Sequence, residues 1–289
     1  MSARAVEVLA TGPLALVQDR GRVGHLAVGV GRAGAADAGA HLLGGRLLGN
    51  APDAASLEVT FGGLRLRAKG DLLVCLTGAT TPATVDGRPM PMASPFEVRD
   101  GQELALGTPT AGLRTYVSIR GGIAATPVLG SLATDTMSGL GPPPLAPGQV
   151  LPVGRVTARF PHVDVAGVRG PATGTVTLDV LPGPRLDWFA APERLASTPW
   201  QVTSRSDRVG IRLEGEPLER RPELRDAELP SEGMVRGAIQ VPPSGLPVLF
   251  LDDHPVTGGY PVISVLRAAA VDLAAQLVPG QHVRLRWDH

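Results

Sequence analysis

The stretch LEVTFGGLRLRAKGDLLVCLTGATTPATVDG, residues 57–87, consists of short runs rich in Leu, Val and Thr that are separated by turn-forming residues. Leu64–Arg67 alternates apolar and cationic side chains, which is typical of a strand with one buried face. Leu72–Thr77 is a mainly apolar run of the length expected for a buried strand. Asp86-Gly87 is a sequence typical of a two-residue hairpin turn. The stretch therefore predicts antiparallel β-structure.

The same pattern continues on both sides of this stretch. The 289 residues include 37 glycines and 28 prolines, without the period of collagen and without polar low-complexity tracts. We therefore predict a mainly β fold with a few short helices. The predicted strands are Val6–Leu9, Leu14–Val17, Leu57–Thr60, Leu64–Arg67, Leu72–Thr77, Thr84-Val85, Phe96–Val98, Leu104–Leu106, Thr115–Ile119, Thr175–Leu181, Gln201–Thr203, Ile211–Leu213, Ala238–Val241, Val248–Leu251, Val262–Val265 and Val283–Trp287.

Three short helices are predicted between these strands. Asp37 is a suitable N-cap for a helix that runs to Leu48, although Gly44 and Gly45 lower its helix propensity. The other two predicted helices are Leu186–Leu195, which Pro192 interrupts, and Val271–Leu277. The length of the chain favours about two domains, and residues 161–174 (PHVDVAGVRGPATG) have the composition of a connection between them.

The composition excludes several kinds of chemistry. Acidic and basic residues balance at 27 each, so no charge excess favours nucleic acid. Lys69, the single lysine, is followed by Gly70 rather than Ser or Thr, so there is no P-loop, and it does not lie between methionines as a biotin-acceptor lysine would. Cys75, the single cysteine, is expected to be a small buried residue. Without a signal-peptide pattern or an 18-residue apolar run, we expect a cytoplasmic protein.

Two arginine-rich segments have the residue types that bind anions. In QDRGRVG (residues 18–24), Asp19, Arg20 and Arg22 lie among glycines, and an Arg there could hold a carboxylate or phosphate through two hydrogen bonds. The alternative is an Asp–Arg pair that fixes a tight loop. The second segment, SRSDRVGIRLEG (residues 204–215), leads into an alternating strand that places Arg212 and Glu214 on one face. The alternative here is a solvated strand face with weak ion pairs.

Two further segments contain polar residues beside apolar strands. Glu232 precedes a strand in which Gln240 lies between Ile239 and Val241. If Gln240 is buried, its amide needs partners, and these could be a ligand or the protein's own backbone. Asp252, Asp253 and His254 end another strand, and His254 could act as an acid or base. A metal site formed by these three residues is disfavoured, because consecutive side chains point in different directions.

Taken together, these segments resemble the carboxyltransferase-like "allophanate hydrolase subunit 2" family. The matching stretches lie in the family's order over nearly the whole chain. They are QDRGRVG (18–24), GVGRAGAAD (29–37), LGN (48–50), LEVTFG (57–62), GGI (121–123), LGSLATD (129–135), LPGP (181–184), SDRVGIRLEG (206–215), SEG (231–233), GAIQVP (237–242) and DHPVTGGYP (253–261). The chain departs from the family pattern at Gly44-Gly45, at Gly139–Pro144 and at Pro255-Val256.

The resemblance implies two tandem cyclophilin-like β-barrel subdomains, which we place at residues 1–165 and 166–289. It also implies one component of an ATP-dependent 5-oxoprolinase that opens 5-oxo-L-proline to L-glutamate. The expected partners are a KipI-like protein and a LamB/YcsF-like protein, which are the other two components of that enzyme. The ATP, with any Mg²⁺, could be held by one of these partners. Two alternatives stay open: a component of a biotin-dependent urea or amide carboxylase, without covalent biotin on this chain, and a KipA-like regulatory protein without catalysis.

The resemblance assigns site residues by position, and we expect them to line one cleft. Arg208 and Arg212 are expected to clamp an anion, and Gln240 to bind the substrate amide. The predicted catalytic residues are Asp207, Asp253 and His254. The predicted substrate-binding residues are Asp19, Arg20, Arg22, Ser206, Arg208, Arg212, Glu214, Glu232, Gln240, Thr257, Gly258, Gly259 and Tyr260. No metal ligands are predicted.

Overall fold

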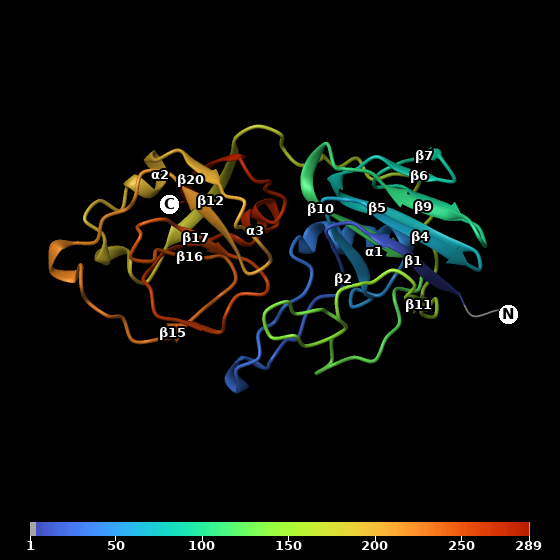
Figure 1. The fold of residues 1–289 in the computed structure, drawn as a ribbon, viewed down its shortest axis with the longest axis horizontal. Coiled ribbons are helices and arrows are strands. Elements are labelled where there is room, and N and C mark those ends of the chain that lie inside the picture. The colour runs from blue at the N-terminus through green and yellow to red at the C-terminus, as the bar shows by residue number, and fades with distance from the viewer. Residues whose placement is uncertain (1–3, 289) are drawn as a thin grey trace. The chain divides into compact units, whose positions relative to one another are not determined.

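The structure is a computed structural model that describes residues 4–288 (Figure 1). Strands account for 35% and helices for 11% of it, which confirms the mainly β prediction. Contacts divide the chain into two units. Unit 1 comprises the described residues up to Arg22, then Ala33–Asp135 and Gly139–Pro171. Unit 2 comprises Val23–Arg32, Thr136–Ser138 and the described residues from Ala172 onward.

Unit 1 consists of two antiparallel sheets. The six-stranded sheet has the order β11-β1-β4-β9-β6-β7, and the five-stranded sheet has the order β2-β3-β10-β5-β8. The strands of the first sheet are β1 (Ala5–Thr11), β4 (Leu64–Lys69), β6 (Ala83–Val85), β7 (Arg88–Met90), β9 (Glu103–Leu106) and β11 (Val150–Pro152). Those of the second are β2 (Leu14–Gln18), β3 (Ser56–Thr60), β5 (Leu72–Thr80), β8 (Pro95–Val98) and β10 (Ala111–Ile119).

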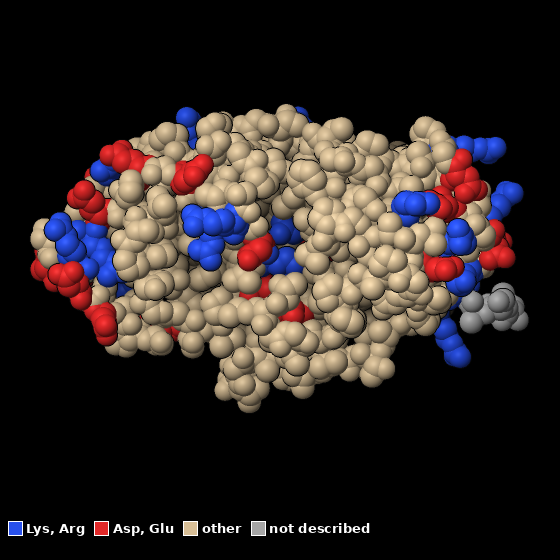
Figure 2. All heavy atoms as spheres, viewed as in Figure 1, with Lys and Arg blue, Asp and Glu red and all other residues tan. Residues whose placement is uncertain are grey.

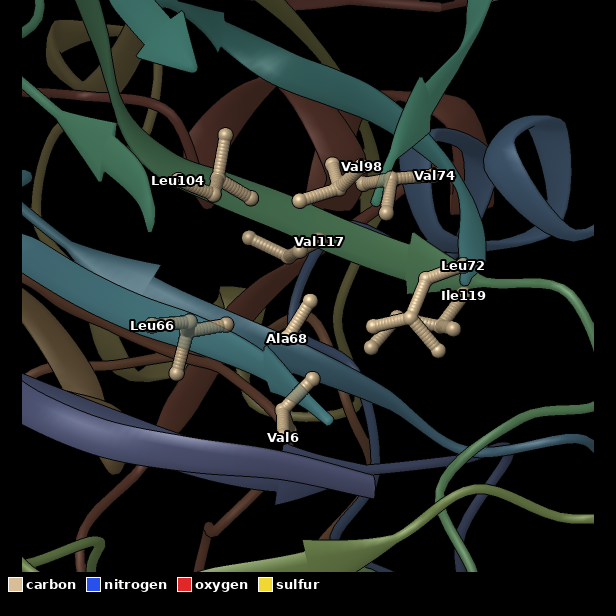
Figure 3. A pocket seen from close by; sticks show the side chains of 9 residues that line it. All are labelled: Val6, Leu66, Ala68, Leu72, Val74, Val98, Leu104, Val117 and Ile119. Carbon is tan, nitrogen blue, oxygen red and sulfur yellow. The ribbon is translucent and has the colours of Figure 1, made fainter. Parts of the chain in front are cut away.

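One apolar core lies between these two sheets. In β4 the alternation is as predicted, with Leu64 and Leu66 buried and Arg65 exposed. A cavity of about 10 Å³ remains in this core, and all the side chains that line it are apolar (Figure 3). A buried water needs at least about this volume and also polar partners. The cavity is therefore a small packing gap and not a candidate site for a substrate.

The hairpin between β6 and β7 confirms the turn predicted at Asp86-Gly87. Asp86 has a φ of 48° and Gly87 a φ of 79°. Positive φ at both central residues is what a type I′ turn requires, and this turn matches the twist of the two strands.

Helix α1 (Ala38–Leu48) confirms the helix predicted after Asp37. The Asp37 carboxylate accepts a hydrogen bond from the Ala40 N–H at 2.8 Å, and the helix ends at Gly49 with a φ of 65°. Gly44, which counts against a helix by propensity, lies against β10. A Cβ atom at this position would lie 2.5 Å from Ser118 Oγ. The glycine therefore allows the close approach of the helix to the sheet.

Gly44→Ala and Gly45→Ala are expected to change stability in opposite directions. Gly44→Ala forces the helix away from Ser118 and should destabilise unit 1 by about 1–3 kcal/mol. At Gly45 a Cβ would meet no atom closer than 4.0 Å, so Gly45→Ala should stabilise by up to about 1 kcal/mol through helix propensity. Urea unfolding of both variants checks this, and equal midpoints would show that Gly44 is not a packing requirement.

Cys75 can report on the unfolding of unit 1. Its side chain is buried on β5 beside Leu47 and Leu48 of α1, as the sequence predicts. Burial raises the pKa of the Cys75 thiol to about 12. The folded protein therefore keeps this thiol protonated and covered, and it becomes reactive when unit 1 opens.

Unit 2 is a closed barrel of seven strands in the order β12-β19-β16-β17-β14-β13-β20 (Figure 1). Its first strand and its last strand pair in parallel, with Val176 opposite Val283. A two-stranded ribbon, β15-β18, accompanies the barrel. The strands are β12 (Val176–Pro182), β13 (Trp200–Val202), β14 (Gly210–Glu214), β15 (Glu232–Gly233), β16 (Ala238–Gln240), β17 (Val248–Phe250), β18 (Thr257–Gly258), β19 (Val262–Leu266) and β20 (His282–Trp287).

Three adjacent strands of this barrel, β16, β17 and β19, are buried on both faces. Ile239, Leu249 and Ile263 point into the barrel core. Their neighbours Phe250 and Val262 belong to a second apolar cluster with Met234. This double burial explains the continuous apolar runs in the sequence, because a strand with one solvated face would alternate.

The helices of unit 2 differ from the prediction. The helix predicted over Leu186–Leu195 is interrupted at Pro192, as the sequence indicates, but its two parts are short: the chain forms a 3₁₀ turn, η2 (Leu186–Trp188), and a separate short helix, α2 (Arg194–Ser197). Pro192 lies between them and cannot donate the backbone hydrogen bond that a continuous helix needs. Helix α3 (Ala268–Ala274) begins three residues earlier than predicted, and further 3₁₀ turns are η1 (Leu26–Val28) and η3 (Pro222–Leu224). Among residues 4–288, no helix has both the length and the hydropathy to span a bilayer.

Candidate functional site

Asp253 is the centre of a buried polar cluster in unit 2, just after β17. Arg208 donates from Nε to Oδ2 and from Nη2 to Oδ1, each at 2.9 Å. Thr136 donates to the same Oδ2 from its N–H at 3.0 Å and from Oγ1 at 2.6 Å. The side chains of Arg208 and Asp253 are 2% and 0% exposed. Both carboxylate oxygens are therefore engaged within the unit, which is the arrangement of a group that fixes its surroundings.

The residues next to Arg208 hold the turn that precedes β14. The Asp207 carboxylate accepts hydrogen bonds from the N–H groups of Val209 and Gly210 at 2.8 and 3.0 Å. Ser206 Oγ accepts one from the Arg212 N–H at 3.0 Å. Both side chains thus act on the backbone of their own segment. The predicted alternation of β14 is confirmed, because Arg212 and Glu214 are exposed and lie on one face.

His254 lies beside this cluster with its ring held in one orientation. The side chain is buried, its Nδ1 is 2.8 Å from the Pro255 carbonyl oxygen, and the Phe250 ring lies 6.2 Å away. Since a carbonyl oxygen can only accept, Nδ1 is the donor and Nε2 is the acceptor nitrogen of the neutral ring. A histidine with a fixed tautomer is suited to acid–base chemistry near neutral pH.

Gln240 finds its partner in the backbone of its own unit. Its Nε2 donates to the Tyr260 carbonyl oxygen at 3.0 Å and is 3.9 Å from Met234 Sδ. A Cβ atom at Gly258 would lie 2.6 Å from this Nε2, so Gly258 allows the ribbon to cross the Gln240 side chain. Of the two partners that the sequence left open for the Gln240 amide, a ligand or the protein's own backbone, the structure shows the backbone.

The β15-β18 ribbon holds the other predicted residues of this region. Glu232 pairs with Gly258 across the ribbon, and its carboxylate accepts two hydrogen bonds from Arg185. Thr257 and Gly259 are exposed, and Tyr260 is 44% exposed. The exposed predicted residues of unit 2 therefore lie in the turn before β14, on β14 itself, at Thr257 of β18 and in the loop after β18.

In unit 1, Asp19 and Arg22 fix the glycine-rich loop. The Asp19 carboxylate accepts hydrogen bonds from the Gly21 N–H at 2.8 Å, from Ser131 Oγ at 2.7 Å and from the Leu132 N–H at 2.6 Å. Arg22 is buried and donates to the Ala133 carbonyl oxygen. Arg20 is exposed. Asp19 and Arg22 are therefore both connected to residues 131–133, and Asp19 also to the loop's own backbone.

A second buried cluster in unit 1 was missed at the sequence level. Glu58 of β3 accepts hydrogen bonds at Oε2 from the Tyr116 hydroxyl at 2.8 Å and the Ala36 N–H at 3.0 Å. Its Oε1 lies 3.5 Å from Arg114 Nε. The Tyr116 hydroxyl in turn accepts from the Asp37 N–H at 2.8 Å. The sequence signal that could have revealed this cluster is a carboxylate and an arginine that both lie within strands. Such side chains are buried where both faces of the strand are covered.

His41 of α1 makes the stability of unit 1 depend on pH. Its Nδ1 is 2.8 Å from Ser56 Oγ, and burial lowers the pKa of His41 below the usual 6.5. The unfolded chain therefore binds a proton at His41 more readily than the folded chain, and stability should fall as the pH drops below 6.5.

The expected slope from His41 is at most about 1.4 kcal/mol per pH unit. Urea midpoints between pH 7.5 and pH 5 measure it. His41→Gln keeps an amide that can bond Ser56 but does not titrate, so it should remove this part of the slope. An unchanged pH dependence in His41→Gln would exclude His41 as the source.

No cluster of three or more His, Cys, Asp or Glu side chains that could hold a metal ion occurs among residues 4–288. The adjacent carboxylates of Asp252 and Asp253 bind different arginines, because Asp252 accepts from Arg236 Nε at 2.9 Å. Lys69 is exposed at the end of β4 and pairs with Glu7 of the neighbouring strand β1. These residues do not fit a phosphate-binding loop or a magnesium–nucleotide site.

Known proteins match this fold over nearly its whole length. The family model of the carboxyltransferase domain, subdomain A and B, matches residues 28–287. The C component of the Escherichia coli 5-oxoprolinase is 34% identical over 96% of this chain and 89% of its own length, and that of Haemophilus influenzae is 30% identical over 96% and 90%. The crystal structure of the K. lactis urea amidolyase has a TM-score of 0.91 and 28% identity over 99% of this chain.

The chain belongs to the carboxyltransferase domain family with subdomains A and B. This chain covers 56% of the protein chain in the crystal structure of TTHA0988 and 19% of the urea amidolyase chain. Both of those proteins therefore contain further parts. The family predicted from the sequence motifs is therefore confirmed.

Proposed function

We propose that this chain is the C component of an ATP-dependent 5-oxoprolinase, which adds water across the amide C–N bond of 5-oxo-L-proline to give L-glutamate. The observation that supports this most is the 34% identity to the C component of a known 5-oxoprolinase over 89% of that protein. The proposed partners are a KipI-like protein and a LamB/YcsF-like protein.

In this proposal the chain orients the substrate and exchanges a proton, while one of the partners holds the ATP. Asp252 and Asp253 do not fit a magnesium–nucleotide site, because their carboxylates bind arginines. Asp207 and Asp253 are proposed as positioning residues, since Asp207 Oδ1 and both carboxylate oxygens of Asp253 accept hydrogen bonds from the unit's own donors. His254 is the proposed proton-exchanging group, because its imidazole follows directly on Asp253 and is oriented by the contact of its Nδ1 with the Pro255 carbonyl oxygen. Arg212 and Tyr260 are exposed and are proposed to contact the substrate.

The test is co-expression with the KipI-like and LamB/YcsF-like partners, followed by an assay of glutamate release that depends on both ATP and 5-oxoproline. His254→Gln should lower kcat by about 100-fold or more, which is typical for loss of a general acid–base group. His282→Gln is the matched control, because His282 is an exposed histidine of β20 and should retain full activity.

Two results would contradict the proposal. Full glutamate release by the two partners without this chain would exclude its role as a required component. Normal kcat in His254→Gln would exclude the proton-exchange role while leaving the assignment of the chain to this enzyme in place.

A second candidate function is transfer of a carboxyl group to urea or a related amide. It is favoured by the TM-score of 0.91 to the K. lactis urea amidolyase. This activity would need a separate biotin carrier, because the one lysine of the chain pairs with Glu7 and is not in a carrier motif. Carboxylation of urea by the chain mixed with a carboxybiotin-loaded carrier, and no glutamate release, would favour this candidate.

A further inference from the structure

A short link in unit 2, Gly259-Tyr260-Pro261, joins the ribbon strand β18 to the barrel strand β19. Tyr260 is 44% exposed, and in the proposed function its side chain contacts the substrate. Pro261 fixes its own φ and confines the residue before it to extended backbone. The place of the Tyr260 side chain therefore depends on how the backbone of this link is held.

Both ends of the link are paired with neighbouring strands. On the side of β18, Gly258 pairs with Glu232 across the ribbon. On the side of β19, the Pro261 carbonyl oxygen accepts a hydrogen bond from the Val241 N–H at 3.0 Å. These pairings fix the backbone before and after Tyr260.

The side chain of Gln240 holds the link between these two ends. Gln240 is 5% exposed, and its Nε2 donates to the Tyr260 carbonyl oxygen at 3.0 Å. Its backbone belongs to β16 of the closed barrel, so a strand of the scaffold carries this donor. A contact made from a strand is held more firmly than one made from a loop. The hydrogen bond therefore sets the position of Tyr260 relative to the barrel.

The Gln240 amide fits against the ribbon because position 258 has no side chain. A Cβ atom at Gly258 would lie 2.6 Å from Gln240 Nε2 and 3.2 Å from Met234 Sδ. Gln240 Nε2 is itself 3.9 Å from Met234 Sδ. Gln240 and Gly258, which the family resemblance assigns to substrate binding, are therefore in contact with each other.

The surface charge of unit 2 makes such a fixed contact important. Figure 2 shows acidic and basic side chains intermixed on the visible face of this unit. A surface of mixed sign does not steer a small carboxylate such as 5-oxoproline to one place as a cationic cleft would. Binding of the substrate then depends on individual groups that are held at defined positions.

We propose that Gln240 is a positioning residue, which sets the place of Tyr260 for substrate binding and does not itself bind the substrate amide. This inference rests on the proposed function, because it takes the Tyr260 side chain as a substrate contact. A contact made equally in the ground state and in the transition state changes KM and leaves kcat unchanged. Loss of the Gln240 donor is therefore expected to change KM.

Gln240→Met tests the proposal, because methionine fills a similar space but has no donor. In the enzyme assembled with both partners, it should raise KM for 5-oxoproline about 10-fold and leave kcat within about twofold. Gln201→Met is the matched control. Gln201 lies in β13, and its Nε2 donates to the Gly280 carbonyl oxygen at 2.9 Å, so the same substitution there should change neither constant.

Two further variants test whether Gln240 acts through Tyr260. Tyr260→Ala should raise KM by at least as much, and Gln240→Met added to it should cause no further increase, because the residue that Gln240 positions is already lost. Gly258→Ala places its Cβ against the Gln240 amide and should raise KM as Gln240→Met does, which keeps the test intact if Gln240→Met folds poorly.

Amide hydrogen exchange of the isolated chain measures the positioning without the assay. Gln240→Met should speed exchange in the peptide that spans residues 257–262, because the link loses one of its contacts with the barrel. Gln201→Met should leave exchange in this peptide unchanged.

The outcomes separate the positioning proposal from the proposed function. If the unchanged complex is active and Gln240→Met lowers kcat and kcat/KM equally, Gln240 contacts the reacting amide, so the positioning proposal is overturned and the function stands. A KM equal to that of the control, an additive increase on top of Tyr260→Ala, or unchanged hydrogen exchange also overturns it. If the unchanged chain and its partners release no glutamate, both proposals fail together.

Discussion

Asp253→Asn is expected to destabilise unit 2 by about 3–5 kcal/mol, which is the usual cost of removing one partner from a buried ion pair. The substitution keeps the shape of the side chain but removes the charge that faces Arg208, whose side chain is 2% exposed. It also weakens acceptance from Thr136, because an amide offers one acceptor oxygen where the carboxylate offers two.

Tryptophan fluorescence during urea unfolding measures this effect in unit 2 alone. All three tryptophans, Trp188, Trp200 and Trp287, lie in unit 2. Arg286→Met is the control, because it breaks the exposed pair with Asp179 on the barrel and should leave the midpoint unchanged.

A double variant separates the cost of leaving Arg208 buried without its charged partner from the stabilisation that the Arg208–Asp253 pair itself provides. Arg208→Met with Asp253→Leu removes both charges and should recover part of the stability lost in Asp253→Asn, because no unpaired charge is then buried. A midpoint for Asp253→Asn within error of the unchanged protein would show that the Arg208–Asp253 pair does not stabilise the barrel.

Glu58→Gln is expected to destabilise unit 1 by a similar amount, about 3–5 kcal/mol. It removes the carboxylate that lies 3.5 Å from Arg114 and that accepts hydrogen bonds from Tyr116 and Ala36. Tyr116→Phe removes only the hydroxyl between Glu58 and the Asp37 N–H, and should cost about 1–3 kcal/mol.

The rate at which Cys75 reacts with a thiol reagent measures the opening of unit 1 in these variants. Burial of the Cys75 thiol keeps the folded state unreactive, so a faster reaction reports a larger open population. Glu103→Gln is the control, because Glu103 pairs with Arg65 at the surface. A Cys75 reaction rate in Glu58→Gln equal to that of the control would contradict the prediction.

Local rules in the sequence predicted most of the fold. The alternation of Leu64–Arg67, the hairpin turn at Asp86-Gly87 and the capping of a helix by Asp37 depend on residues close in sequence, and each is confirmed. The helix predicted over Leu186–Leu195 is divided at Pro192, which is also a local effect that the sequence indicates. Gly44 was judged by propensity alone, although its contact with Ser118 comes from a strand distant in sequence.

The residue types of the candidate site were predictable, but their contacts were not. Arg208 and Asp253 are 45 positions apart, and the sequence contains no signal that they neutralise each other. Thr136 has no charge and lies far from both in sequence, so it was not predicted as their partner. A search for anion-binding arginines therefore finds Arg208 by composition, while the structure shows that its guanidinium holds a carboxylate of its own unit.

The parallel pairing of β12 with β20 determines when the barrel of unit 2 can close during synthesis. The barrel of unit 2 cannot close until its final strand, His282–Trp287, has left the ribosome and reached Val176–Pro182. Until then β12 presents an open edge that could pair with another chain. The two sheets of unit 1 contain strands from residue 5 to residue 152 and can form while the barrel is still being translated. Nascent chains arrested before His282 are therefore expected to leave this edge open to aggregation.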